Sequence, residues 1–591
     1  METATSKFVS CISHAEIERG YGKTLAQLLN EQAGIVVNGA YQPTGTLVSI
    51  YMEGTLGGRT MVLLDGVPIW DPSGISDYFD INFISLYNIE RIDIYRGSQS
   101  TLFGGGAMAG AINIITRKDK TEKAVNLEAV QSLGNENTWN SHVQIWGKQK
   151  KISYAASYFR LQTSGFSYAN DSTSKQGFDK DSYKGYIANA RLEYAPSAYW
   201  TMKAYCLFSR YRADSDVNDF IDDPYYFYTN NNLITGTDFK YHKKKWLVAG
   251  NYQYGSTKRD YDYTNYSSEH YGGKTHFAAL YMQVSIAKNI SLLAGADYRY
   301  GHLDYSNYDS STGQGTSFYP SVSQYASYAN LGYANKDSSL NIGLGGRLNK
   351  HSAYGYTHSF SFDVAYRYHH VQLSGNIATG YKNPSIYQLY NDIAGNAALS
   401  PEQSVSYRMC IQHKQGIFIQ QLQFFYRTIN NMIDFNGTSS GYSNYAGQKV
   451  GGIEYEWKVK LSPHISFTGN YTFLSGNETT NSRINYTDTV TYTYLIRRPK
   501  HIANIGLHYT SSHFSAAITG RYVGNYYDVG YGEPDFAMKH FMVVNAYASF
   551  NIQPHFLVYM NAQNITNHTF FDIRGYNSIP LLINGGVRYI L

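Results

Sequence analysis

The sequence predicts a membrane-spanning antiparallel β-barrel of about 22 strands, preceded by an N-terminal domain of a different pattern. The chain has 591 residues, more than one hydrophobic core usually accommodates. Tyrosine contributes 59 residues, aromatic residues 16% and charged residues only 16%, which is typical of two aromatic girdles around a polar lumen. No run of 18 or more apolar residues occurs, so helical membrane spans are excluded.

The strand pattern begins at about residue 124 and is cleanest late in the chain. Residues 453–461 and 465–473 alternate between apolar and polar side chains, so one face of each predicted strand meets lipid and the other meets the lumen. A tight turn, residues 462–464, connects them. Short turns of this kind alternate with long polar connections, and an even number of strands places both barrel ends on the periplasmic side.

Charge and cysteine content exclude several other classes. The net charge of +5 is small for this length and comes without basic clusters, so we predict no nucleic-acid partner. The cysteines, at 11, 206 and 410, are too widely spaced for a disulfide framework or a zinc site. No pattern of a convergent acid, base and nucleophile occurs, so we predict neither an enzyme nor a covalent cofactor.

The segment IERIDIYRGSQSTLFGGGAMAGAINIITR, residues 89–117, resembles the end of the plug domain of TonB-dependent outer-membrane receptors. The segment LLDGVPI, residues 63–69, and the opening residues 3–37 are similar to earlier plug elements of that family. The resemblance implies an α+β plug over residues 1–120 inside a barrel formed by residues 121–591. It also implies the outer membrane as location, contact with outer-membrane lipid, and TonB of the inner-membrane energy-coupling complex as partner.

A plugged barrel predicts a gated importer. A lumen of about 22 strands admits solutes of roughly a thousand daltons and would leak if it were open. The outer membrane has no ATP supply, so release of a tightly bound solute needs mechanical work on the plug. The opening METATSKFVSCIS has neither the basic start nor the apolar core of a secretory signal, so we expect the chain to begin after the signal peptide and the TonB box.

The predicted solute is vitamin B12 (cobalamin), because residues 48–80 and 163–194 are similar to the cobalamin-transporter branch of the family. By position, that resemblance assigns substrate contacts to two plug loops, at Tyr41, Gln42, Trp70, Asp71 and Tyr78, and ordinary packing against the barrel wall is the alternative for these side chains. A ferric siderophore is the alternative, and a surface adhesin without transport is an alternative of another class. Haem is disfavoured because residues 391–400 contain no histidine. A surface substrate-binding lipoprotein is a further candidate partner.

Carboxylates crowd two predicted extracellular loops. In cobalamin transporters, a D-x-D pair in the loop that resembles residues 163–194 helps to bind calcium, and the pair here is Asp179 and Asp181. The next long loop adds Asp214, Asp216, Asp219, Asp222 and Asp223. Such a density of carboxylates predicts calcium between the loops, although the EF-hand spacing is absent and acidic loops that simply stay solvated are the alternative.

Two charges depart from the family pattern. Glu53, in SIYMEG, stands where the family usually has arginine, and Arg408 stands where it usually has glutamate. We predict that they form a sign-reversed ion pair between plug and barrel. Arg96 keeps the usual polarity and is expected to pair with Glu454 or Glu456. These pairs are predicted to latch the plug; the alternative is independent solvated charges.

Overall fold

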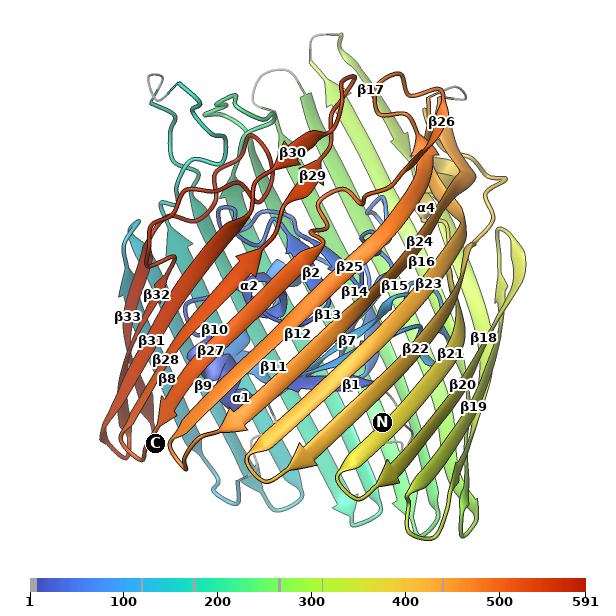
Figure 1. Cartoon of the computed structure of the whole chain (residues 1–591), viewed down its shortest axis with the longest axis vertical. Coiled ribbons are helices and arrows are strands. Elements are labelled where there is room, and N and C mark those ends of the chain that lie inside the picture. Colours follow the sequence, from blue (N-terminus) through green and yellow to red (C-terminus); the bar gives the residue numbers. More distant parts are fainter. Residues whose placement is uncertain (1–7, 118–120, 174–176, 264–266, 311, 438–439) are drawn as a thin grey trace.

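The computed structural model describes residues 8–117, 121–173, 177–263, 267–310, 312–437 and 440–591. Its strands form a closed barrel around the N-terminal domain (Figure 1). Long loops rise from one barrel end, and short turns close the other end, near which the C-terminus lies. The N-terminal domain fills the lumen, so we call it the plug.

The plug is built on a five-stranded sheet of order β1-β6-β7-β4-β5. A smaller sheet pairs β2 with β3. The turn between α1 and α2 contains Gly22 at φ +95°, and Thr24 caps α2 by accepting a hydrogen bond from Gln27 N at 3.2 Å. The plug elements are β1 (Val9–Ile12), α1 (His14–Arg19), α2 (Leu25–Asn30), β2 (Ile35–Asn38), β3 (Ser49–Met52), β4 (Thr60–Leu64), β5 (Val67–Ile69), η1 (Ile81–Phe83), η2 (Leu86–Asn88), β6 (Ile89–Arg96), α3 (Ser100–Phe103) and β7 (Gly110–Thr116).

The first half of the barrel follows in antiparallel order. Its strands are β8 (Asn126–Gly134), β9 (Thr138–Gln149), β10 (Ile152–Thr163), β11 (Tyr183–Ser197), β12 (Trp200–Asp214), β13 (Phe227–Lys243), β14 (Trp246–Asp262), β15 (Ser267–Ala287), β16 (Ile290–Asp309), β17 (Gln314–Phe318), β18 (Ser321–Ala334), β19 (Leu340–His351) and β20 (Gly355–Tyr368).

The second half completes the ring, and β33 pairs with β8 to close it. Its elements are β21 (Val371–Lys382), α4 (Ile386–Tyr390), β22 (Glu402–Gln415), β23 (Phe418–Asn436), β24 (Gly441–Lys460), β25 (Ile465–Asn481), β26 (Thr489–Tyr492), β27 (His501–Thr510), β28 (Phe514–Val523), β29 (Tyr526–Asp528), β30 (Phe536–Met538), β31 (Phe541–Gln553), β32 (Phe556–Gln563) and β33 (Leu582–Ile590). Because β16 also pairs with β18 and β25 with β27, β17 and β26 are additions, and 22 described strands make the barrel, which confirms the predicted fold class.

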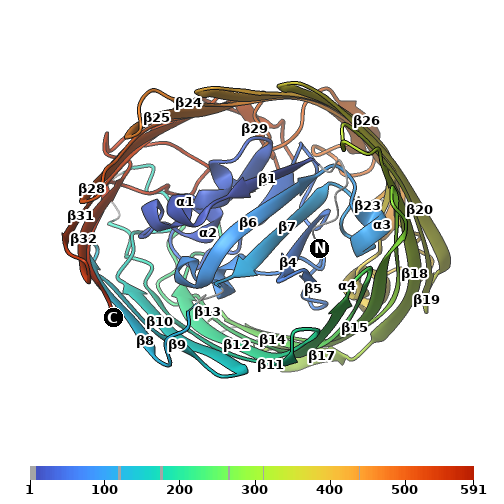
Figure 2. The same cartoon turned by 90° about the horizontal axis from the view of Figure 1, so that it is seen from below.

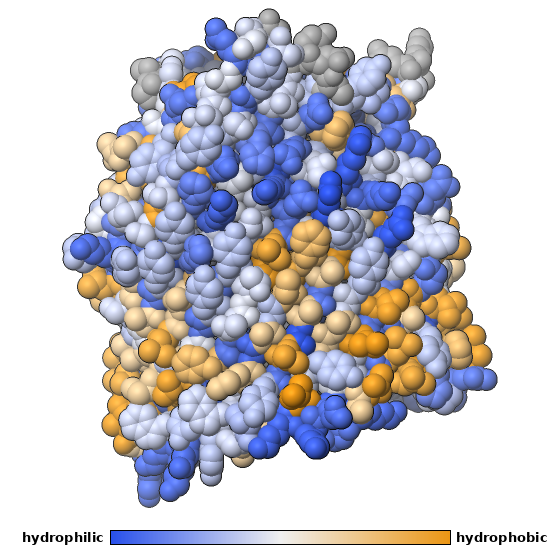
Figure 3. All heavy atoms as spheres, turned by 180° about the vertical axis from the view of Figure 1, so that it is seen from behind, coloured by the Kyte–Doolittle hydropathy of each residue, from blue (hydrophilic) through white to orange (hydrophobic). Residues whose placement is uncertain are grey.

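The outer wall carries the predicted apolar face. On the side shown in Figure 3, hydrophobic residues form a band in the lower half of the wall, between hydrophilic ends. On β22, Tyr407 and Met409 are 47% and 49% exposed, whereas Arg408 between them points inward and is 5% exposed. Among the described residues, no helix is both long and apolar enough to cross a membrane.

The plug packs against the wall through several hydrophobic clusters, and the largest joins Leu29, Ile92 and Ile112 of the plug with barrel side chains such as Tyr211. Viewed from below, the plug sheet crosses the lumen, and α1 and α2 lie toward β28, β31 and β32 (Figure 2). Strand β7 ends at Thr116 and β8 begins at Asn126. The predicted domain boundary between residues 120 and 121 borders residues 118–120, which are outside the described residues, so it stays a prediction.

Candidate functional site

Glu53 lies at the centre of a buried ion cluster between plug and wall. It follows β3 in the left-handed region, at φ +51°, which turns its side chain toward β22 and β23. One carboxylate oxygen accepts a hydrogen bond from Arg408, and the other accepts one from Arg427 Nη2 at 2.8 Å. Glu53 and Arg408 therefore lie in contact, and all three side chains are at most 1% exposed.

The two arginines determine the charge of Glu53. Burial raises the pKa of this carboxyl, but the positive charges of Arg408 and Arg427 outweigh burial and hold its pKa below the ordinary value. Sequence reasoning missed Arg427. A signal existed, because Arg427 pairs in register with Ser406 on the next strand and alternation places it on the lumen face.

Arg96 contacts both of its predicted partners. Its Nε lies 2.9 Å from Glu454 Oε2 and its Nη2 lies 3.2 Å from Glu456 Oε1. The contact with Glu454 is ionic, because the N–H is not aligned with the oxygen as a hydrogen bond requires. Arg96 also donates to Ser10 Oγ at 2.6 Å, which ties β1 to the end of β6. Whether these pairs act as a latch stays a prediction.

Another buried pair was not predicted. Arg59 of the plug donates from Nε and Nη2 to the two oxygens of Glu402, at 2.8 and 2.6 Å. Such a two-pronged contact fixes orientation as well as charge. Glu402 follows Pro401 in the PE motif, so the motif itself was the available signal. Together with the Glu53 and Arg96 contacts, this pair joins the plug to β22, β23 and β24.

The first outward plug loop, residues 38–45, is covered by extracellular loops. Tyr41 is 4% exposed, and its ring lies 5.5 Å from that of Phe570. Gln42 Oε1 accepts a hydrogen bond from Tyr168 Oη at 3.4 Å. In this state both residues pack against barrel loops, so their contact with a solute stays a prediction.

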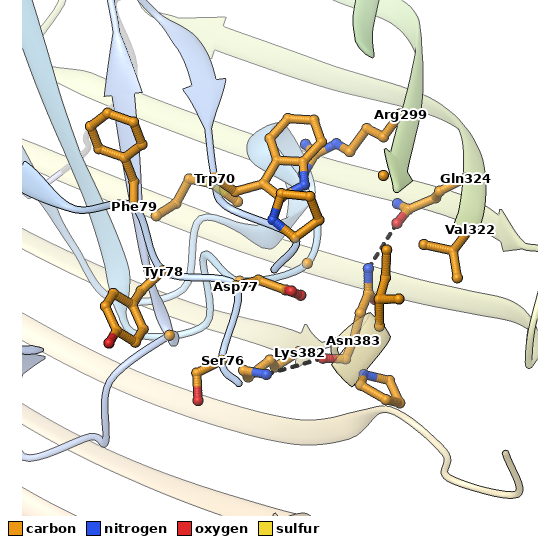
Figure 4. A pocket seen from close by; sticks show the side chains of 18 of the residues that line it. Trp70, Ser76, Asp77, Tyr78, Phe79, Arg299, Val322, Gln324, Lys382 and Asn383 are labelled. Carbon is orange, nitrogen blue, oxygen red and sulfur yellow. Dashed lines mark hydrogen bonds between the residues drawn. The ribbon is translucent and has the colours of Figure 1, made fainter. Parts of the chain in front are cut away.

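The second outward loop borders a recess of about 90 Å³ between plug and wall (Figure 4). Trp70 forms one side, with the Arg299 guanidinium 5.9 Å from its ring centre. Tyr78 also lines the recess. Asp71 lies elsewhere: its Oδ1 accepts hydrogen bonds from Ser73 and its Oδ2 lies 3.4 Å from Arg259 Nε, so it holds the shape of the loop.

Two ionisable groups that sequence reasoning missed line the recess. Asp77 sits at φ +55°, and its buried Oδ1 accepts no hydrogen bond from the described residues. Burial raises the pKa of Asp77 to about 7, with nearby Lys382 opposing the shift and Asp71 adding to it. Lys382 is 3% exposed, and in the described chain its only hydrogen bond is to Asn383 O at 3.1 Å, which leaves further N–H donors available.

The acidic loops pack together through backbone donors. Asp181 Oδ2 accepts from Tyr168 N at 2.5 Å, and Asp216 accepts from Ala169 N at 2.7 Å. Asp214 accepts from Ser182 Oγ at 2.6 Å, beside Asp181, and Asp179 N donates to Asp222 at 3.2 Å. Within the described ranges, no group of three or more His, Cys, Asp or Glu side chains is arranged to hold a metal ion.

Two family models match the chain. The TonB-dependent Receptor Plug Domain matches residues 2–111, and the model described as TonB dependent receptor-like, beta-barrel matches residues 118–565.

Solved structures of similar fold include the siderophore receptor PirA from Acinetobacter baumannii (14% identity, 99% of this chain and 98% of that chain, TM-score 0.80). A mutant ferric enterobactin receptor PfeA from Pseudomonas aeruginosa, in complex with enterobactin, matches at 16% identity over 100% of both chains with TM-score 0.81. The copper transporter OprC matches at 12% identity over 99% of this chain and 100% of that chain, with TM-score 0.82.

Proposed function

The chain belongs to the TonB-dependent receptors, and from this premise we propose that the solute it imports is an iron–siderophore complex. Members of this family are transporters of the outer membrane rather than enzymes, and they depend on TonB for import. The receptors for a siderophore and for ferric enterobactin that share its fold support this solute class over cobalamin, which the sequence favoured.

The recess beside Trp70 is the observation that carries the proposal. At about 90 Å³ it is too small for a whole siderophore or corrinoid, but it accepts one projecting group. Lys382 has N–H donors left over, and Asp77 is half protonated near neutral pH and then also donates. Donors of this kind favour an anionic oxygen, as in a catecholate, hydroxamate or carboxylate arm.

Cobalamin is the second candidate. Its support is the resemblance of residues 48–80 and 163–194 to cobalamin transporters, together with the contact between the two acidic loops in which Asp179 N donates to Asp222. A calcium ion between these loops belongs to this second candidate.

The test is ligand binding by the purified full-length receptor, followed by tyrosine and tryptophan fluorescence. A ferric tricatecholate, a ferric hydroxamate and cyanocobalamin are titrated separately. We expect one ferric complex to bind at least tenfold more tightly than cyanocobalamin. Lys382→Gln is expected to weaken that binding about tenfold, whereas Lys245→Gln, in the short turn between β13 and β14, leaves it unchanged.

Uptake of radioactive iron by cells with and without TonB then links binding to import. Tighter binding of cyanocobalamin, with no binding of either ferric complex, would contradict the siderophore proposal and favour the second candidate.

A further inference from the structure

Two cavities lie between the plug and the wall, the upper one beside the barrel closure and the lower one along β22–β32. The upper cavity, about 120 Å³, lies between the plug and the extracellular halves of β9, β10, β11 and β33, and its lining includes Gln42, Leu161 and Asn584. The lower cavity, about 540 Å³, lies beneath α1 and α2 on the periplasmic side, and its lining includes Cys11, Glu16 and Asn561. Both volumes far exceed the ~10–15 Å³ that one water needs.

The cavities meet at one turn of the plug. Lys23 lines both of them. Asn584 of the upper cavity and Asn561 of the lower one are direct register partners on β33 and β32. A Cβ placed on Gly22 would lie 3.4 Å from Asn561 Cβ and 3.6 Å from Asn584 Cβ. The turn between α1 and α2 therefore lies at this junction.

The wall at this junction carries unpaired polar groups. Asn561 is 1% exposed, and neither its Oδ1 nor its Nδ2 has a hydrogen-bond partner among the described residues. The Oδ1 atom of Asn584 is likewise buried and unpaired. Because an unsatisfied buried polar group is costly, water or a polar solute is the natural partner here.

The turn is held more weakly than the plug sheet. Its contacts with the wall are a hydrogen bond from Gln563 Nε2 to Gly22 O at 2.9 Å and the packing of the buried Tyr21 ring against Tyr559. Buried ion pairs, in contrast, hold the sheet to β22, β23 and β24. Glu18 pairs with Arg588 close by, but Glu18 is 30% exposed and the pair fixes α1 rather than the turn. Displacement of the turn therefore breaks none of the ion pairs between the plug sheet and the wall.

We propose that the imported solute crosses along this side of the plug, with the turn at residues 20–24 as the constriction. The route passes the extracellular halves of β9–β11 and β33 and then the periplasmic halves of β27, β28, β31 and β32. The route joins the upper and lower cavities once the turn moves away from Asn561 and Asn584. It rests on the family membership and not on the identity of the solute.

Thiol blocking distinguishes this route from one that descends along β10–β12. In a background with Cys11, Cys206 and Cys410 replaced by serine, Tyr21→Ala and Gln563→Ala remove the packing and the hydrogen bond that hold the turn. We expect this variant to conduct small ions in a planar bilayer at least fivefold more than its parent.

Single cysteines then map the leak. Thr519→Cys lies in the lower cavity, and Ser157→Cys lies in a separate crevice of about 60 Å³ at β10–β12. Thr519 and Ser157 are both half-buried and face the lumen, so Ser157→Cys is a matched control for Thr519→Cys. A bulky maleimide on Thr519→Cys should suppress the leak, and the same adduct on Ser157→Cys should not. The reverse pattern, or no leak from the variant with the freed turn, would overturn the route.

A disulfide provides the second measurement. Gly22→Cys with Asn584→Cys should lock the turn when oxidised and reduce TonB-driven uptake at least tenfold, with recovery after reduction showing that the protein is folded. Gly57→Cys with Ser49→Cys, whose Cβ positions are 3.5 Å apart within the plug, is the oxidation control and should leave uptake unchanged. Full uptake by the oxidised lock would overturn the proposal. If the maleimide on Thr519→Cys suppresses the leak but cells take up no ferric complex, the proposed route stands and the siderophore proposal is contradicted.

Discussion

At the scale of single residues, a buried carboxylate is stable in this lumen because two cationic partners surround it. Glu53 is buried between Arg408 and Arg427, and each of these charges would be costly without the others. The sequence predicted the contact with Arg408, because Glu53 and Arg408 both depart from the charge expected in their motifs. Sequence reasoning missed the contact with Arg427, since no motif marks Arg427.

We predict that Glu53→Gln loosens the plug. The substitution keeps the shape of the side chain but leaves two buried guanidinium groups without a counter-charge, which costs roughly 3–5 kcal/mol. Protease sensitivity of the plug in the intact receptor measures the effect. Glu16→Gln, on the periplasmic face of the plug, serves as the control and should change little.

Glu53→Arg and Arg408→Glu should each loosen the plug, and the double exchange should recover only part of the plug stability that each single exchange removes. Arg427 would then face a new arginine, and the repulsion persists until Arg427 is also replaced. Complete recovery by the double exchange would show that Arg427 contributes little to the cluster.

Asp77 predicts a pH dependence of binding. Its pKa of about 7 means that the carboxyl gains a negative charge as pH rises through neutrality. Burial disfavours the charged form of Asp77 in the folded protein, which raises its pKa. The protonated carboxyl therefore contributes to folding stability at low pH, and this contribution is lost as pH rises through about 7. Affinity for an anionic ferric complex should fall about five- to tenfold from pH 6 to pH 8, and Asp77→Asn should abolish this slope. An unchanged slope in Asp77→Asn would assign the titration to another group.

At the scale of elements, the strands follow from alternation, whereas the long loops do not. Alternating polarity along β22 and β24 placed Arg408, Glu454 and Glu456 toward the lumen. No such period exists in the loops, so their packing over Tyr41 was not predicted. That packing depends on partners far away in sequence, such as Phe570.

The acidic loops are predicted to loosen as pH rises. Burial and the nearby Asp216 raise the pKa of Asp181 to about 8, and burial and Asp222 raise that of Asp179 to about 6. Carboxyls whose pKa is raised on folding stabilise at low pH, and that contribution is lost as pH rises through about 6 to 8. Hydrogen exchange of residues 179–182 should therefore accelerate between pH 5.5 and pH 8.5, after correction for the intrinsic rate.

Calcium should reverse that acceleration if the cation belongs to these loops. At pH 8.5, millimolar calcium is expected to restore protection and a chelator to remove it, while Asp181→Asn is protected in both conditions. Equal exchange with and without calcium would contradict the calcium site and leave the pH effect in place.

At the scale of the whole molecule, plug and barrel are complementary in charge. The wall contributes arginines at 408 and 427 and glutamates at 402 and 454, and the plug contributes the opposite sign at each contact. Each pair costs solvation when it is buried, so its larger effect is to specify one seating of the plug in the lumen.

Removal of residues 1–116 should leave a barrel that inserts into the outer membrane and conducts. The ladder of β8 to β33 is complete without the plug, and its lumen-facing charges become solvated. We expect a large, stable conductance in planar bilayers, at least tenfold above that of the whole receptor. A barrel that fails to insert would show that the plug is needed for assembly.

The sequence by itself determined the barrel, the plug and the pairing of Glu53 with Arg408, because strand alternation and short motifs are local signals. Only the tertiary structure decided which distant segments of the chain contact one another. It revealed the Arg59–Glu402 pair, the recess formed by Asp77 and Lys382, the burial of Tyr41, and the two cavities that meet at Gly22. Each of these joins residues that are hundreds of positions apart, and their proximity depends on the register of a closed barrel and on how the plug is seated within it.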